Sequence, residues 1–179
     1  MTVDEYKKID SAFNEGVFLS KVNNMFIKYF SSIMLDKMDT IKHFVNDEVY
    51  KDGIALVEEW KNKKARHMFD MLNVQESSIS SIYEDDENYV IKVHLIARYL
   101  DYYIDLNTNK VEGNNQNRIT ATYALELTKS KNSLKNKMIK KCPTCGAPLL
   151  INNSGKCEYC GNTYNLKDYD YIITKMIKS

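Results

Sequence analysis

The chain has 179 residues, of which 44% are hydrophobic and 27% are charged. This composition predicts one ordinary globular domain with room for a small second unit, and it excludes a chain that is disordered throughout. Because 25 basic residues face 24 acidic ones, the formal net charge is only +1 and indicates neither a nucleic-acid nor a membrane partner. The charged first residues and the lack of a long apolar run predict a cytoplasmic protein that is neither exported nor membrane-spanning.

The first predicted helix begins near Glu15, with Asn14 as its N-cap and Phe13 packing against Phe18. Its apolar residues recur at intervals of three and four and predict one buried face: Phe18, Leu19, Val22, Met25, Phe26, Tyr29, Phe30, Ile33 and Met34. A shorter helix is expected over residues 41–45. A longer helix over residues 49–64 should bury Tyr50, Ile54, Val57 and Trp60.

After Phe69 the hydrophobic period changes from about 3.6 to 2, which indicates a change from helix to sheet. Alternating patterns predict strands over residues 89–99 and 119–127, with turns at residues 84–88, 107–110 and 113–115. An antiparallel meander is the simplest topology. We therefore predict an α+β domain in which a curved sheet wraps the first helix, similar to the cone-like nuclear-transport-factor-two-like superfold.

Proline and cysteine mark a boundary near residue 140. Both prolines and all four cysteines lie beyond it, together with three of the six glycines, whereas the preceding segment suits long helices and strands. The sequence thus predicts a cone-like domain over residues 1–138 and a smaller unit over residues 139–179. A short helix around residues 169–177 is expected to close the smaller unit.

The smaller unit contains two C-x-x-C-G motifs, in which the cysteines are Cys142 and Cys145, then Cys157 and Cys160. Each motif brings two sulfurs to one side of a tight loop, and two motifs supply the four thiolates of a tetrahedral Zn²⁺ site. A site closed by four sulfurs leaves no position for water and is therefore structural. Two disulfides, two redox pairs and a rubredoxin-like iron site are the alternatives.

Five segments, at residues 8–10, 18–22, 101–105, 142–148 and 155–161, together resemble the bacterial zinc-ribbon branch of the Tim44-like family. The family is named for a peripheral tether of the mitochondrial inner-membrane import motor. The resemblance spans nearly the whole chain. It implies a non-catalytic, cone-like domain that associates with membrane lipid or protein partners, in the context of protein transport.

Other residues suggest weaker sites. Tyr29, Trp60, His94, Arg98 and Tyr103 are candidates for lining a pocket in the cone, which would serve a small-molecule enzyme or hold a hydrophobic ligand. On a regular strand, however, His94 and Arg98 face away from Tyr103, and His43 and His67 show no partner pattern. The sequence therefore favours a non-enzymatic protein.

A run of lysines precedes the first cysteine motif and is the one local basic patch: Lys129, Lys131, Lys135, Lys137, Lys140 and Lys141. It could contact an anionic surface and hold the protein peripherally at a membrane, or it could be a solvated linker. Nucleic acid is disfavoured because the small unit contains Tyr159 and Tyr164 but no arginine. The sequence thus predicts a binding or scaffold protein with one structural zinc ion, whose partner it does not name.

Overall fold

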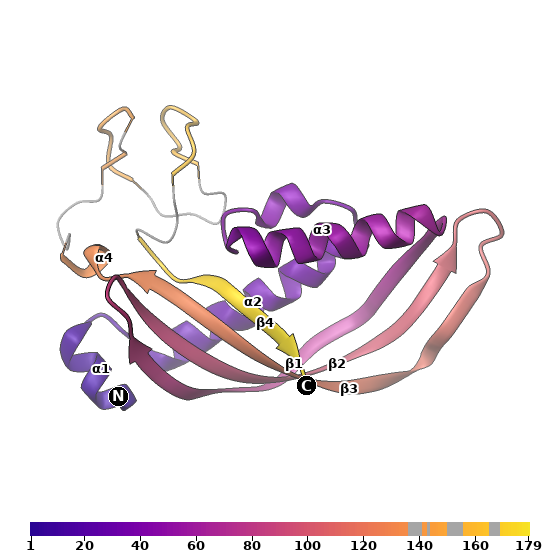
Figure 1. Cartoon of the computed structure of the whole chain (residues 1–179), viewed down its shortest axis with the longest axis horizontal. Helices are drawn as coiled ribbons and strands as arrows, with labels where there is room; N and C mark the ends of the chain where they lie inside the picture. Colours follow the sequence, from indigo (N-terminus) through magenta and orange to yellow (C-terminus); the bar gives the residue numbers. More distant parts are fainter. Residues whose placement is uncertain (136–140, 143, 150–155, 165–168) are drawn as a thin grey trace.

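The computed structural model describes residues 1–135, 141–142, 144–149, 156–164 and 169–179. Its elements, in chain order, are helices α1 (Val3–Ile9), α2 (Glu15–Met34), η1 (Met38–Ile41) and α3 (Asp47–Asn62), strands β1 (Ala65–Glu84), β2 (Asn88–Asp105) and β3 (Val111–Ser130), the one-turn α4 (Asn132–Lys135) and strand β4 (Ile172–Lys178). In Figure 1 the long strands form a curved sheet, and α2 and α3 lie within its concave side. The predicted α+β class and cone-like arrangement are confirmed.

Helix α2 follows its sequence signals closely. The Asn14 side chain accepts a hydrogen bond from the Val17 N–H, as expected of an N-cap. The rings of Phe13 and Phe18 lie 5.4 Å apart between centroids, so the predicted hydrophobic contact at the helix start is present. The apolar face of α2 is buried against the concave side of the sheet.

The two helices that follow differ in detail from the sequence predictions. The short helix expected over residues 41–45 is wrong, because the structure has the 3-10 helix η1 at Met38–Ile41 instead. In α3 the buried residues are Val49, Gly53 and Val57, one position away from most of the predicted face. Gly53 permits this rotation, since a Cβ atom there would lie 2.2 Å from the Met38 methyl carbon.

The sheet is an antiparallel meander with strand order β1-β2-β3-β4. The turns predicted at residues 84–88 and 107–110 separate its first three strands, whereas the turn predicted at residues 113–115 is wrong, because these residues lie within β3. Strands β1 and β2 pair from Ala65 opposite Asp105 to Glu84 opposite Tyr89. Strand β4 pairs only with the second half of β3, from Tyr123 opposite Lys178 to Thr128 opposite Ile172. Among the described residues, the first half of β3 therefore has a neighbouring strand on one side alone.

The sequence did not predict β1 as a long strand, because three register shifts interrupt its alternation. The shifts fall between Asp70 and Asn73, between Val74 and Glu76, and between Ile79 and Ser81. Each shift inserts one extra residue, so the positions facing the concave side are spaced alternately by three and by two: Phe69, Leu72, Val74, Ser77, Ile79 and Ile82. Such a series matches neither the period of a strand nor that of a helix.

The helix predicted over residues 169–177 is also wrong, because this segment contains strand β4. Ile173 and Met176 both face the core, and a spacing of three is typical of a helix. Here it arises from a register shift opposite Glu126 and Leu127. The predicted boundary between residues 138 and 139 lies outside the described residues, whereas β4 extends the sheet of the larger domain.

Candidate metal centre and cavity

Two matching loops carry the four cysteines. In the first, the Cys142 N–H donates to the Ala147 carbonyl at 2.8 Å and the Gly146 N–H to the Cys142 carbonyl at 2.9 Å. Cys157 makes the equivalent bonds in the second loop, with Asn162 and Gly161, at 2.9 and 2.8 Å. Gly146 and Gly161 both have φ of +71°, a conformation that favours glycine and explains the residue after each C-x-x-C motif. Figure 1 shows the two loops side by side beyond one end of the sheet.

The loops bring four sulfurs together. All four Sγ atoms lie within 4.8 Å of one another. The Cys142 and Cys160 sulfurs are 3.7 Å apart, and those of Cys145 and Cys157 are 3.8 Å apart. Four sulfurs at about 2.3 Å from a tetrahedral ion would be separated by about 3.8 Å. The four cysteines are free and stand at the spacing of metal ligands.

The electrostatics of the cluster also suit a cation. Hydrogen bonds from the backbone N–H groups of Cys145 and Thr144 lower the pKa of the Cys142 thiol to about 6. The Asn162 N–H favours the Cys160 thiolate, but burial and the three neighbouring sulfurs outweigh it and raise the pKa of Cys160 to about 12. The four thiols therefore resist losing their protons together, because neighbouring thiolates repel one another. A dication at their centre would offset this repulsion.

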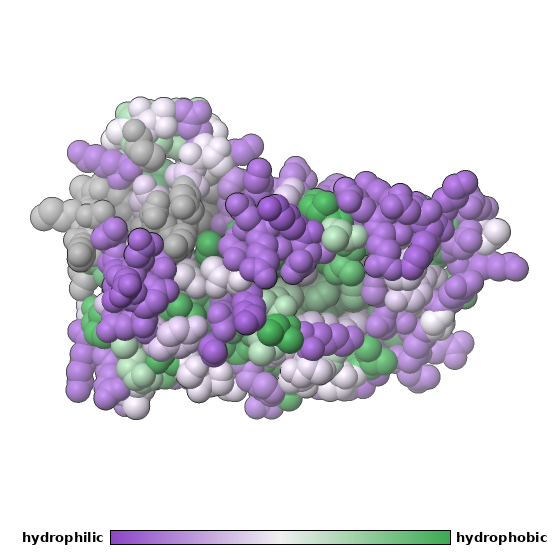
Figure 2. Space-filling view, viewed as in Figure 1, coloured by the Kyte–Doolittle hydropathy of each residue, from purple (hydrophilic) through white to green (hydrophobic). Residues whose placement is uncertain are grey.

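A cavity of about 280 Å³ lies between the sheet and the two long helices. Figure 2 shows hydrophobic atoms in the hollow between α3 and the sheet edge formed by β4. The lining combines aromatic and aliphatic side chains with a few polar groups: Tyr29, Phe30, Val49, Asp52, Leu56, His67, Phe69, Tyr99, Asp101, Tyr123, Met176 and Lys178. All four strands of the sheet contribute, so the cavity depends on the complete sheet.

Two polar groupings face this cavity. The His67 Nε2 atom lies 2.7 Å from an Asp101 carboxylate oxygen. Burial lowers the pKa of His67 below its ordinary value, and the hydrogen bond with Asp101 offsets only part of that effect. On the neighbouring strands, Lys178 Nζ donates to the Tyr99 hydroxyl at 3.0 Å, and that hydroxyl lies 2.8 Å from the Tyr123 hydroxyl.

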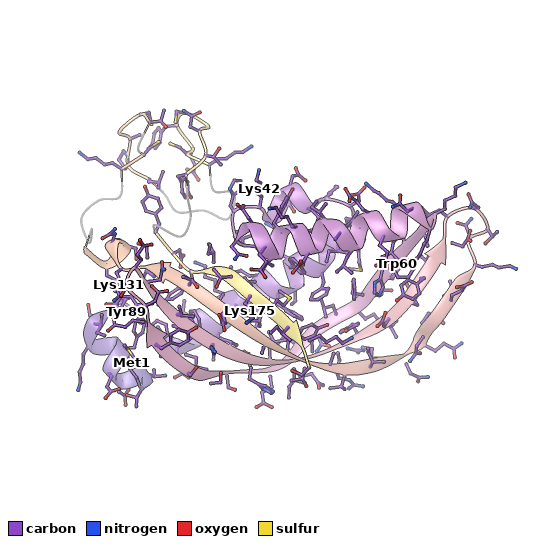
Figure 3. All side chains as sticks on the ribbon, in the orientation of Figure 1. Met1, Lys42, Trp60, Tyr89, Lys131 and Lys175 are labelled. Carbon is purple, nitrogen blue, oxygen red and sulfur yellow. The ribbon has the colours of Figure 1, made fainter. Side chains whose placement is uncertain are left out.

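The residues predicted to line a pocket separate into two groups. Tyr29 lines the cavity. Trp60, labelled in Figure 3, stacks on Tyr103 with 4.0 Å between ring centroids and lies beside His67, at the end of the concave side where α3 ends. His94 and Arg98 lie on the opposite, convex face, where His94 is exposed. The structure thus brings Tyr29, Trp60 and Tyr103 to the concave side and leaves His94 and Arg98 outside it.

Sequence reasoning missed the His67 and Asp101 pair and also missed Lys178. His67 lies on β1 opposite Tyr103, two residues from Asp101, but this register could be deduced only if β1 were recognised as a strand. Lys178 is the last residue of β4, one position beyond the helix that was predicted over residues 169–177. Knowledge of the bulges in β1 and β4 would have placed both residues, but the sequence alone does not show where these bulges lie.

The lysine run is divided among several structures. Lys129 belongs to β3 and pairs with Asp10 at 3.0 Å, while Lys131 pairs with Glu84 at 2.9 Å and lies over the Tyr89 ring, as Figure 3 shows. Lys135 is the last residue of α4 and Lys141 is exposed. Lys137 and Lys140 lie outside the described residues. Two of the six candidate lysines are therefore matched by carboxylates of the chain itself.

Comparison with known proteins decides the family. The Tim44-like domain profile matches residues 1–139. The chain belongs to the Tim44-like domain family. The matched residues of this Tim44-like domain cover the helices and the first three strands, whereas the cysteine loops and β4 follow it.

Among solved structures, the chain is similar to the intermembrane space region of chloroplast protein ARC6, with 12% sequence identity and a TM-score of 0.43 over 89% of this chain and 94% of that one. No curated protein matches the chain significantly. Within the described part of the chain, no helix is long and apolar enough to cross a membrane.

Proposed function

We propose that the chain is a non-enzymatic binding or scaffold protein, in which a Tim44-like domain contacts a partner and a structural zinc ribbon is inserted before the last strand. The observation that carries the zinc assignment is the spacing of the four cysteine sulfurs, which matches a tetrahedral site with no position left for water. Zinc is the ion that most often occupies a closed set of four cysteines joined by C-x-x-C loops.

Metal analysis of freshly purified protein tests the zinc assignment. We expect one zinc ion per chain, lost in a variant with Cys145→Ser and Cys160→Ser and retained with Thr144→Ser. If the analysis finds one iron ion per chain instead, the site is rubredoxin-like and the zinc assignment is wrong. Protein without metal and without free thiols would contradict the proposal, because it would show that disulfides form instead.

Family membership supports the binding role. A Tim44-like domain accounts for residues 1–139, and the four-cysteine cluster has no open coordination position for catalysis. We propose that the partner is a protein and that the chain works in the cytoplasm, where thiols stay reduced, with at most a peripheral association with a membrane. The proposed role in protein transport rests on the family alone.

Charge limits the membrane role. Lys129 and Lys131 already pair with carboxylates, and a zinc ion bound by four thiolates would add two negative charges near Lys141. Attraction to anionic lipid should therefore be weak and sensitive to salt. Flotation with anionic and neutral vesicles, each at low and near-physiological salt, tests this. We expect binding to disappear at the higher salt, whereas salt-resistant binding to neutral vesicles would show direct insertion into lipid and refute the proposal.

A further inference from the structure

The cavity on the concave side has spare hydrogen-bond donors. Lys178 Nζ donates to the Tyr99 hydroxyl, and the hydroxyls of Tyr99 and Tyr123 share one hydrogen bond. Whichever phenol donates in that bond, the pair contains two hydroxyl hydrogens and uses only one between them. No acceptor for the second hydrogen is found among the described residues. One O–H group, with two further N–H groups of Lys178, is thus available to a ligand.

The charged groups around the cavity have both signs. Lys178 contributes a positive charge and Asp101 and Asp52 each a negative one, and Lys178 and Asp52 are both exposed, where water screens them. His67 bonds to one oxygen of the Asp101 carboxylate. A charged ligand of either sign would meet a group of like charge here, whereas an uncharged oxygen acceptor would satisfy the spare donors without adding a charge.

Size and lining restrict the ligand further. A volume of about 280 Å³ is at the lower limit of typical small-molecule sites. Aromatic rings from both sides surround it, with Tyr29 and Phe30 from α2 and Phe69 from β1. Flat apolar molecules of one or two rings suit such walls, because offset and edge-to-face ring contacts are favourable.

We propose that this cavity binds a small, uncharged, ring-containing molecule through a carbonyl or similar oxygen, which accepts hydrogen bonds from the spare hydroxyl of the Tyr99 and Tyr123 pair and from Lys178. This small-molecule site goes beyond the partner-binding role, which does not require it. A further polar atom of the lining, His67 Nδ1, is buried without a hydrogen-bond partner in the described structure and can accept from a hydroxyl group on the same molecule.

Four small probes of similar shape test the proposal on the full-length, metal-loaded protein. Acetophenone presents a carbonyl, α-methylstyrene replaces its oxygen by carbon, benzoate carries a negative charge and benzylammonium a positive one. Binding is measured by NMR titration of the side-chain methyl groups, with Met176 as the reporter within the cavity. We expect acetophenone to bind severalfold to about tenfold more tightly than α-methylstyrene, and more tightly than either ion.

Matched variants locate the effect. A variant with both Tyr99→Phe and Tyr123→Phe removes the two hydroxyls together, because either phenol alone would keep a free O–H, and it should markedly reduce the advantage of acetophenone over α-methylstyrene. Tyr102→Phe is the control, because it removes a hydroxyl on the convex face of the same sheet, where Tyr102 bonds to Asp70. Equal binding of acetophenone and α-methylstyrene, tighter binding of an ion, or no binding of any probe would each overturn the proposal. Equal loss of affinity in both variants would also overturn it.

Discussion

His67 is a buried histidine whose protonation opposes folding. Burial lowers its pKa in the folded chain, whereas in the unfolded chain the pKa returns to about 6.5. Below that value the unfolded state takes up more protons than the folded state, so stability falls as the pH falls. The charged groups that influence His67 are Asp101, Lys178 and Glu59. Of these, Asp101 and Glu59 attenuate the effect without reversing it.

We therefore expect the free energy of unfolding to decrease between pH 7.5 and pH 5.5, with a shallower slope after His67→Gln. Urea titrations followed by the fluorescence of Trp60, the single tryptophan, measure it. The comparison is made in a Cys157→Ser background, so that release of metal does not contribute. An unchanged slope after His67→Gln would show that the ring is protonated equally in both states.

Lys129 and Lys131 both form ion pairs, but the two pairs differ in burial. The Lys129 and Asp10 side chains are only 12% and 6% exposed, whereas those of Lys131 and Glu84 are 26% and 48% exposed. Lys129→Met should cost about 3 kcal/mol of stability, because Asp10 is left buried without its partner. Lys131→Met should cost less than about 1 kcal/mol. Thermal or urea unfolding measures both, and equal losses would mean that burial does not distinguish the two pairs.

Strand β4 secures the edge of the sheet through one fully buried residue. The Ile173 N–H donates to the Phe44 carbonyl at 2.7 Å, and the Asn46 N–H donates to the Ile173 carbonyl at 2.9 Å. The strand therefore joins β3 to the segment before α3. Ile173→Ala should cost about 2–5 kcal/mol, the usual penalty for such a core cavity.

Ile177→Ala is the matched control for this prediction. The Ile177 side chain is 48% exposed on the same strand, so we expect its loss to cost less than about 0.5 kcal/mol. Denaturant unfolding of the two variants gives both values. A similar, small effect of the two substitutions would argue that β4 does not pack as the structure shows.

At the scale of elements, the sequence predicts what has a regular period. The α2 face and the inward residues of β2, such as Val93 and Leu95, could be assigned because their spacing matches one template throughout. Strands β1 and β4 could not, since bulges change the spacing within each strand. The four metal ligands could be predicted because a C-x-x-C motif is local in the sequence. The pairing of His67 with Asp101 could not, because it depends on the register between β1 and β2.

At the scale of the whole molecule, the cysteine loops are an insertion between β3 and β4. Ile173 packs in the same core as α2, so the sheet is complete only when the chain has passed through the loops and returned. The free energy of closing a flexible loop changes only slowly with its length, by about 0.6 kcal/mol per doubling. Unfolding the loops should therefore leave the helices and sheet folded.

We predict that Cys157→Ser releases the metal and unfolds the two loops while the Tim44-like domain keeps a cooperative transition. Metal content, amide hydrogen exchange in residues 141–164 and Trp60 fluorescence follow the two parts separately. Ser154→Ala, a substitution outside the ligand set, should retain metal and serves as the control. If the variant loses the Trp60 transition as well, the loops and the sheet form one cooperative unit.

The half-paired strand β3 affects how the protein behaves at high concentration. An open strand edge can pair with the edge of another molecule and so begin fibrous aggregation. The open part of β3 is rich in polar side chains from Glu112 to Arg118, and Gly113 has φ of +100°, which interrupts the regular strand. In the described part of the chain β1 forms the other edge of the sheet, and this edge has three bulges. Both long edges thus carry features that oppose edge-to-edge pairing with another molecule.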